Sequence, residues 1–325
     1  MHKNKAANIV VSGSLAYDQI MNFPGRFSDH ILANQTHNLN ISFVLSDART
    51  SFGGTAGNIA YNLSLLNIKP TILGIVGSDF SEYQQALKKQ GADLSHIAKL
   101  EVTSQGVKTK TAVAHIITDK DDNQIAAFYP GPSLKNYASK AVSGLKEISL
   151  AIIAAEDKGR MLEYAKSYSR RHVPYVFDPG QALTLFSGTD VKLALRGAKV
   201  LIGNDYEIKV ILNKTKLSLS DLRKLVDILV ITKGAQGSII YQGAEKIIVK
   251  AAKPKNTSDP TGAGDAYRAG LIKGLLMGYN LKTCGQLAGL VACYTVEKAG
   301  TQTHNFTIKE LQTRYYTNFK EKILL

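Results

Sequence analysis

Cysteine is scarce in this chain of 325 residues, which contains two, Cys284 and Cys293, nine positions apart in an apolar helical pattern. Two cysteines cannot build a disulfide framework, and their spacing is not that of a CxxC metal or redox site. The seven histidines are scattered without an HExxH motif or paired spacing, which argues against a zinc site. These absences favour a reducing, cytoplasmic setting.

Long hydrophobic runs are also missing. The longest, from Leu150 to Ala155, falls well below the ~20 residues that a membrane-spanning helix needs. The apolar run Ile9–Val11, which follows Lys3 and Lys5, is far shorter than the about 7–15 residues of a signal-peptide core. We therefore expect neither export nor a membrane partner.

Acidic residues are outnumbered, with 26 Asp and Glu against 40 Lys and Arg, so that the formal net charge is +14. Such a charge is compatible with nucleic-acid contact, a membrane surface or an anionic substrate. However, no block of about five like charges is present. Dispersed basic residues are typical of a solvated surface, so we expect no nucleic-acid partner.

Apolar runs typical of strands alternate with patterns typical of helices along most of the chain. Strands separated by helices indicate right-handed crossovers and a mainly parallel central sheet, which is the α/β class. With only eight prolines and 44% hydrophobic residues, the chain has ample material for a core. Strands are predicted at 7–12, 70–76, 150–155, 174–177, 200–202 and 228–232, helices at 56–66, 81–90, 159–171, 261–277, 281–298 and 307–320, and a hairpin at 238–250.

Two regions, about 16–46 and 106–130, break this rhythm with short extended runs. In the second, Thr111–Thr118 and Ile125–Tyr129 flank a polar turn, which indicates a hairpin. We expect both regions to form one small β-sheet lid over the main sheet. The chain is thus predicted to be a single domain, 1–325, with a discontinuous lid.

The segment Asp259–Gly270 carries the most chemical information. Gly262 and Gly264 permit tight backbone geometry, so that successive amides at the start of the following helix can point at an anion. Asp265 lies in the first turn of that helix, where the helix dipole favours an ionised carboxylate. A carboxylate beside a phosphate cradle is suited to take a proton from an attacking hydroxyl. From these residues alone, a simple helix cap is an equally good interpretation.

Two further stretches have candidate binding residues. Gly53 and Gly54 precede a helix that carries Asn58, and by itself this is an ordinary strand-to-helix turn. Asp18 follows Ser14 shortly after the first strand, where a buried carboxylate could accept hydrogen bonds from two neighbouring hydroxyls of a sugar.

The Asp259–Gly270 segment resembles, nearly residue for residue, the second signature of the PfkB family of carbohydrate and nucleoside kinases, and the Gly53–Asn58 segment matches the first. The resemblance implies a ribokinase-like three-layer α/β/α sandwich with a β lid. It also implies that Asp265 is the catalytic base and that an anion hole holds the transferred phosphate, formed by Gly262, Ala263 and Gly264. The same resemblance assigns the sugar hydroxyls to Gly53, Gly54 and Asn58, with Ser14 and Asp18 on the ribose side.

The resemblance extends to the nucleotide side. Asn204 and Glu207 match an element that handles Mg²⁺ and phosphate, with Glu207 acting through water. Thr232, Gly234 and Gly237 match a nucleotide loop and imply contacts with ATP. Asp259 and Thr261 match part of a site that holds K⁺ in many members, and the stretch 288–300 is expected to edge the adenine.

Within the family, the stretches around Asp18–His30, Phe128–Gly131 and Phe177–Gln181 resemble bacterial, actinobacterial-type adenosine kinases. This implies transfer of phosphate from ATP to the 5′-hydroxyl of adenosine, and a possible homodimer. Phe128 would stack on the purine, Ser42 would approach the base and Gln181 the ribose. Where related enzymes carry an aromatic residue this chain has Ala114, so another nucleoside or a sugar remains an alternative acceptor; a non-catalytic nucleotide- or nucleic-acid-binding protein is the alternative of another class.

Overall fold

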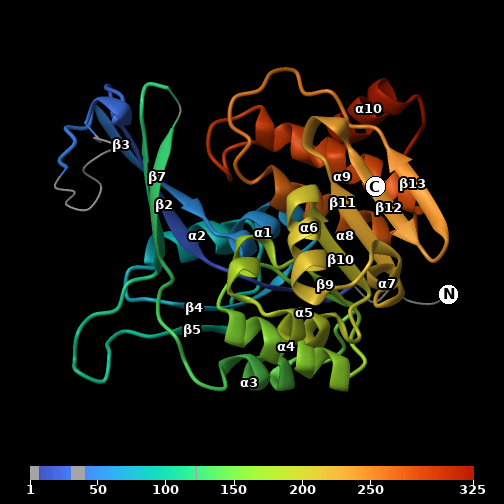
Figure 1. Cartoon of the computed structure of the whole chain (residues 1–325), viewed down its shortest axis with the longest axis horizontal. Coiled ribbons are helices and arrows are strands. Elements are labelled where there is room, and N and C mark those ends of the chain that lie inside the picture. The colour runs from blue at the N-terminus through green and yellow to red at the C-terminus, as the bar shows by residue number, and fades with distance from the viewer. Residues whose placement is uncertain (1–6, 31–40, 122) are drawn as a thin grey trace.

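The computed structural model describes residues 7–30, 41–121 and 123–325. Its centre is a nine-stranded sheet in the order β13-β12-β11-β10-β9-β8-β1-β4-β5, which is parallel from β11 to β5 and antiparallel at β12 and β13 (Figure 1). The strands are β1 (Ile9–Ser12), β4 (Thr71–Val76), β5 (Ile97–Lys99), β8 (Leu150–Ile153), β9 (Tyr175–Phe177), β10 (Val200–Asn204), β11 (Ile228–Thr232), β12 (Ser238–Gln242) and β13 (Glu245–Val249). The predicted parallel sheet is confirmed, whereas β5 was not predicted.

Helices cover both faces of this sheet because successive strand side chains point to opposite sides. Ile9 and Val11 pack into one core and Val10 into the other. The first core is closed by α1 (Thr55–Leu65), α2 (Ser81–Lys89), α8 (Ala263–Leu276), α9 (Leu281–Val296) and α10 (Ile308–Phe319), and the second by α3 (Tyr137–Gly144), α4 (Lys158–Arg170), α5 (Gly188–Leu195), α6 (Asp205–Thr215) and α7 (Leu219–Lys224). The three-layer α/β/α sandwich is therefore confirmed, with α3, α5, α6 and α7 as unpredicted members.

A second sheet of four strands has the order β3-β2-β6-β7 and stands to one side of the main body (Figure 1). It consists of β2 (Ala16–Asn22), β3 (Asp47–Gly53), β6 (Ala112–Thr118) and β7 (Gln124–Tyr129). The hairpin β6–β7 lies where the sequence placed it. The predicted end of the first lid segment, residue 46, was wrong, because β3 continues the small sheet beyond it and pairs antiparallel with β2. The exposed, mostly polar residues that begin β3 gave no alternating apolar pattern to predict a strand.

The carboxyl ends of the parallel strands meet along one edge of the main sheet. β4 lies on one side of β1 and β8 on the other, so the chain order reverses at β1. Crevices outside the carboxyl ends of strands at such a reversal are where open α/β sheets bind ligands. The small sheet joins the main body here, because β1 runs into β2 and β3 runs directly into α1.

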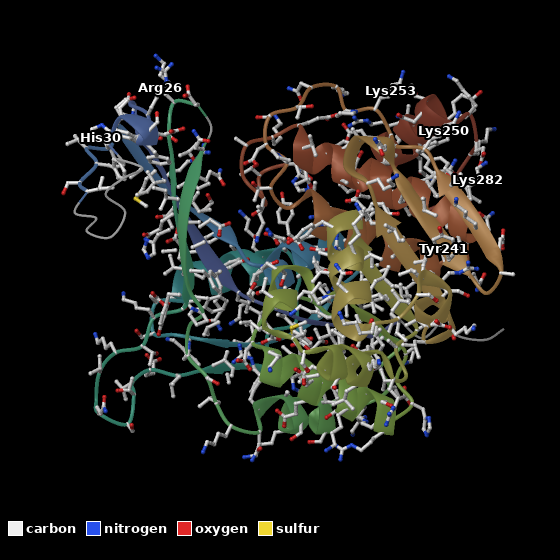
Figure 2. All side chains as sticks on the ribbon, viewed as in Figure 1. Arg26, His30, Tyr241, Lys250, Lys253 and Lys282 are labelled. Atoms are coloured by element: carbon white, nitrogen blue, oxygen red, sulfur yellow. The ribbon has the colours of Figure 1, made fainter. Side chains whose placement is uncertain are left out.

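No helix within the described residues is long and apolar enough to cross a membrane. The basic side chains are dispersed over the surface. Figure 2 shows Lys250 and Lys253 on the main body, far from Arg26 and His30 at the tip of the small sheet.

Candidate active site

A cleft of about 380 Å³ opens at the carboxyl edge of the main sheet. Part of its lining comes from residues at or just beyond the ends of five strands, β1, β8, β9, β10 and β11. The other lining residues belong mainly to α1, α8 and the small sheet. The lining includes Ser14, Asp18, Gly54, Asn58, Ala114, Phe128, Ala155, Asp178, Gln181, Asn204, Glu207, Thr232, Thr261, Gly262, Gly264, Asp265 and Arg268. Most of the predicted site residues, which come from distant parts of the sequence, are thus brought into one cavity.

Asp265 lies in the first turn of α8 and faces this cleft. Its Oδ2 accepts a hydrogen bond from Asn58 Nδ2 at 2.8 Å. Burial raises the pKa of Asp265 to about 7, against the opposing effects of the Asn58 hydrogen bond and the positive charge of Arg268. A carboxyl group with this pKa can accept a proton near neutral pH, which is the property that a general base requires.

The amino end of α8 provides amides for an anion. Gly262 caps the helix with φ of 78°, in the left-handed region that glycine enters without a steric penalty. The Ala263 amide is already used, because it donates to the Pro260 carbonyl at 3.1 Å. In the described chain, no hydrogen bond occupies the amides of Gly262, Gly264 and Asp265. The cradle predicted at 262–264 therefore has its free donors at Gly262, Gly264 and Asp265 instead of at Ala263.

A chain of hydrogen bonds fixes the orientation of Asn58. Gln302 Nε2 donates to Asn58 Oδ1 at 3.0 Å and also lies 2.6 Å from the Tyr83 hydroxyl, which donates to the Gly53 carbonyl at 2.9 Å. With its oxygen held by Gln302, the Asn58 amide must present its nitrogen to Asp265. Sequence reasoning missed Gln302 because no motif marks it and it comes from the loop after α9.

Replacement of Gln302 tests this orientation. Gln302→Leu frees the Asn58 amide to rotate, and we expect kcat to fall about 10-fold, the equivalent of one hydrogen bond of ~1–1.5 kcal/mol. The KM for either substrate should change little, because Gln302 does not line the cleft. Steady-state kinetics beside Gln85→Leu, a glutamine exposed on α2, provide the control. An unchanged kcat in Gln302→Leu would contradict the role.

The sugar side of the cleft is built where β3 meets α1. Gly54 has φ of 84°, and a Cβ there would lie 2.5 Å from the Ser14 carbonyl oxygen, so only glycine fits. A Cβ on Gly53 would lie 2.1 Å from Asp18 Oδ2, which shows how closely the carboxylate approaches this turn. Burial, followed by the negative charge of Asp259, raises the pKa of Asp18 to about 6. Ser14 lines the cleft, but its Oγ accepts from the Thr55 amide and so also fixes the start of α1.

An ion pair that the sequence did not predict lies close to the carboxyl group of Asp265. Arg268 donates from Nε and Nη2 to the two oxygens of Asp178, both at 2.8 Å, and the two side chains are 8% and 3% exposed. Both residues line the cleft. Arg268 stands one helical turn after Asp265 on α8, a spacing that could have suggested it, whereas Asp178 follows β9 without a recognisable motif.

A separate cavity of about 380 Å³ adjoins the cleft and shares Thr232 and Gly264 with it. The predicted nucleotide residues Thr232, Gly234 and Gly237 lie here, together with side chains from the stretch 288–300. The lining of this cavity is mostly apolar and includes Val249, Ala252, Tyr267 and, from α9, the mostly small residues Gly285, Gly289, Ala292, Cys293 and Val296. Such an apolar lining suits a heterocyclic base.

The described residues contain no group of three side chains that could hold a metal ion. Glu207 Oε2 accepts from the Asn204 amide at 2.7 Å, and Asn204 Oδ1 accepts from the Glu207 amide, so the pair caps α6. Glu207 lines the cleft, and within the described chain its Oε1 accepts no hydrogen bond, an arrangement that fits Mg²⁺ held mainly by phosphate oxygens and water.

The carboxylate of Asp259 is held by the backbone. It accepts from the Thr261 amide at 2.9 Å and the Gly300 amide at 3.0 Å. Although burial opposes the effect, these hydrogen bonds keep the pKa of Asp259 below its ordinary value. An ionised carboxylate in this loop is a suitable ligand for a monovalent cation. The K⁺ site itself stays a prediction.

The residues predicted to contact the acceptor nucleoside fall into two groups. Phe128 and Gln181 line the cleft, and Phe128 pairs with Ala114 across β6 and β7. Ser42 is exposed and does not line the cleft, so its approach to the base stays a prediction. The ring centroids of its neighbour Phe43 and of Phe23 lie 4.7 Å apart in an aromatic cluster at the lid tip.

The sequence profile of the pfkB family of carbohydrate kinases matches residues 8–308. The chain belongs to this family. The match spans the lid, the Asp265 cradle and the nucleotide cavity, so family membership and the geometry of the site agree.

Several relatives of this kinase carry the name nucleoside kinase. One from Methanothermobacter thermautotrophicus is 35% identical over 272 residues, 82% of this chain and 84% of the relative, and one from Methanocaldococcus jannaschii is 32% identical with similar coverage. Among solved structures, the nucleoside kinase of Burkholderia thailandensis in complex with inosine superposes with a TM-score of 0.85 at 33% identity, over 97% of this chain and all of that one. The resemblance to adenosine kinases stays a prediction.

Proposed function

We propose that this kinase transfers the γ-phosphoryl group of Mg-ATP to the 5′-hydroxyl of a purine nucleoside. The observation that carries the proposal is Asp265, a carboxyl group with a pKa of about 7 at the amino end of α8, next to unoccupied amides. Adenosine is the acceptor that the sequence resemblance implies, and the Burkholderia nucleoside kinase holds inosine.

In this mechanism the ribose lies between the small sheet and α1. There Asp18 accepts hydrogen bonds from the ribose hydroxyls, and Asn58 donates a hydrogen bond to one of them. The 5′-hydroxyl then faces Asp265, which removes its proton as the oxygen attacks the γ-phosphorus. The amides of Gly262, Gly264 and Asp265 stabilise the negative charge on the phosphoryl oxygens. When bound with ATP, Mg²⁺ neutralises charge on the phosphates, and Glu207 would hold its waters.

The acceptor is tested by ADP release with Mg-ATP and K⁺ against adenosine, inosine, guanosine, cytidine, ribose, fructose and no acceptor. Turnover that depends on a nucleoside is the expected result. Turnover with sugars alone would retain the kinase chemistry but reject the nucleoside assignment. Salt-sensitive nucleic-acid binding without any ADP release would favour the non-catalytic alternative.

The pH profile of kcat/KM reports the base. Because Asp265 must be ionised to accept a proton, and its pKa is about 7, we expect kcat/KM to rise tenfold per pH unit below about 7 and to level off above it. Protonation of Asp18, with a pKa of about 6, should add a second loss at lower pH through the KM for the nucleoside. A profile that is flat from pH 5 to 8 would contradict Asp265 as the base.

A further inference from the structure

A third cavity, of about 350 Å³, continues the cleft on the side away from the nucleotide. It shares Ser14, Ala155, Gln181 and Phe128 with the central cleft and no residue with the nucleotide cavity. The three cavities therefore lie in a row, with the Asp265 cleft in the middle. If the ribose and phosphates occupy the middle, the base of the acceptor nucleoside occupies this third cavity, which we call the base pocket.

The walls of the base pocket are mostly apolar and come from both sheets. Leu15, Ala112 and Leu185 are examples, and Phe128 also lines the pocket, with 57% of its surface exposed. One ion pair interrupts this apolar lining, formed by Glu156 after β8 and Arg160 in the first turn of α4.

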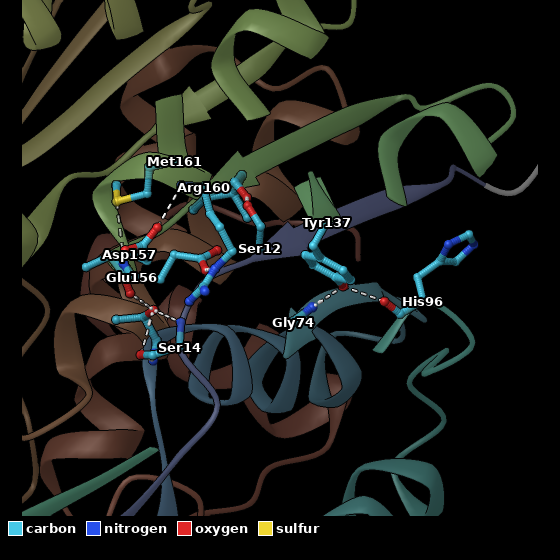
Figure 3. Close-up of polar contacts among 12 residues, drawn as sticks. Ser12, Ser14, Gly74, His96, Tyr137, Glu156, Asp157, Arg160 and Met161 are labelled. Carbon is cyan, nitrogen blue, oxygen red and sulfur yellow. Dashed lines mark hydrogen bonds and ion pairs between the residues drawn. The ribbon is translucent and has the colours of Figure 1, made fainter. Parts of the chain in front are cut away.

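The ion pair is held in a fixed position. Arg160 Nε donates to Glu156 Oε2 at 2.5 Å, and the Arg160 amide donates to Asp157 Oδ1 at 2.9 Å. The two side chains are 10% and 2% exposed. Figure 3 shows Glu156, Asp157, Arg160 and Met161 gathered beside Ser14, which belongs to both the base pocket and the cleft.

Hydrogen-bonding capacity remains on both partners. Glu156 Oε1 is buried and has no partner in the described chain, and no hydrogen bond within that part of the chain is made by the Arg160 Nη groups. A buried unsatisfied carboxylate oxygen is costly and calls for an explanation. Stability does not supply one, because Asp157 already caps α4 and a buried ion pair is seldom better than apolar packing.

We propose that Arg160 and Glu156 recognise the 6-oxo edge of a purine, so that inosine and guanosine are preferred to adenosine. This inference rests on the proposed function. Hypoxanthine and guanine present acceptors at O6 and N7 and a donor at N1. Arginine is the usual partner of O6 and N7, and a carboxylate accepts from N–H. Adenine has a donor at N6 and an acceptor at N1. The Arg160 guanidinium would then face the N6 amino group, donor against donor, and the Glu156 carboxylate would face N1, acceptor against acceptor.

The test compares kcat/KM for inosine, guanosine, adenosine and purine riboside, which lacks the 6-substituent, in the wild-type kinase. A correct bidentate contact discriminates by about 1–3 kcal/mol, so inosine should exceed adenosine by roughly 5- to 150-fold. Glu156→Gln, which keeps the shape and adds a donor, should lower that ratio at least about 10-fold while the KM for ATP stays unchanged. Gln85→Leu, on the exposed face of α2, should preserve the ratio.

The outcomes separate this inference from the function on which it rests. A wild-type preference for adenosine over inosine, or an unchanged ratio in folded Glu156→Gln, would overturn the recognition by Arg160 and Glu156 while leaving a nucleoside kinase. A preference for cytidine over every purine would also overturn it. ADP release with no nucleoside at all would reject the proposed function itself. Should Glu156→Gln fail to fold, the wild-type ratio decides alone.

Discussion

Asp265→Asn should lower kcat by about 100- to 10,000-fold, the usual contribution of a positioned general base. The replacement is isosteric and removes the negative charge, and with it the ability to accept a proton. Its amide oxygen can still accept the hydrogen bond from Asn58, so the neighbouring network is retained. The KM for the nucleoside should stay within a few-fold of the wild-type value, because the lost interaction belongs to the transition state.

The control is Asp227→Asn, at an exposed carboxylate between α7 and β11 that lines no part of the cleft. Single-turnover kinetics with Mg-ATP separate the chemical step from product release. Near-normal turnover in Asp265→Asn would remove Asp265 from the mechanism.

Arg268→Met should destabilise the fold by about 3–5 kcal/mol, because it leaves the carboxylate of Asp178 buried without its cation. The Asp178 side chain is only 3% exposed, and both of its oxygens accept from Arg268. Urea unfolding measures the loss. The double variant Arg268→Met/Asp178→Leu should recover most of the stability, since apolar packing can replace a buried pair.

An exposed ion pair provides the matched control. Lys282 and Glu321 are 55% and 44% exposed, so Lys282→Met should change the free energy of unfolding by less than about 1 kcal/mol. In folded Arg268→Met, loss of the cation should also raise the pKa of Asp265 and move the pH profile to higher pH. Equal stabilities for Arg268→Met and Lys282→Met would show that the Arg268–Asp178 pair is not structurally important.

The central sheet could be predicted because its buried strands, such as Ile228–Thr232, are continuous apolar runs bounded by helical patterns. Short or polar elements could not be predicted: β3 begins with four exposed residues, and β5 is only three residues long. Their pairing depends on contacts with β2 and β4, which local sequence does not encode.

The site shows the same division. Asp265, Gly54 and Asn58 belong to compact motifs in which backbone geometry and chemistry occur together. Gln302 and Asp178 act through partners more than 80 residues away in the chain, so only the fold shows their roles. The Ala263 amide illustrates the limit of a motif, because its hydrogen bond to Pro260 cannot be derived from the glycine spacing.

The most direct test of the central claim is identification of the product. Incubation of the kinase with Mg-ATP and either inosine or adenosine, followed by phosphorus NMR and mass spectrometry, should show a nucleoside 5′-monophosphate formed in equal amount to ADP. The account would be contradicted by ADP and inorganic phosphate in equal amounts with the nucleoside unchanged, or by a phosphate on the 2′- or 3′-hydroxyl.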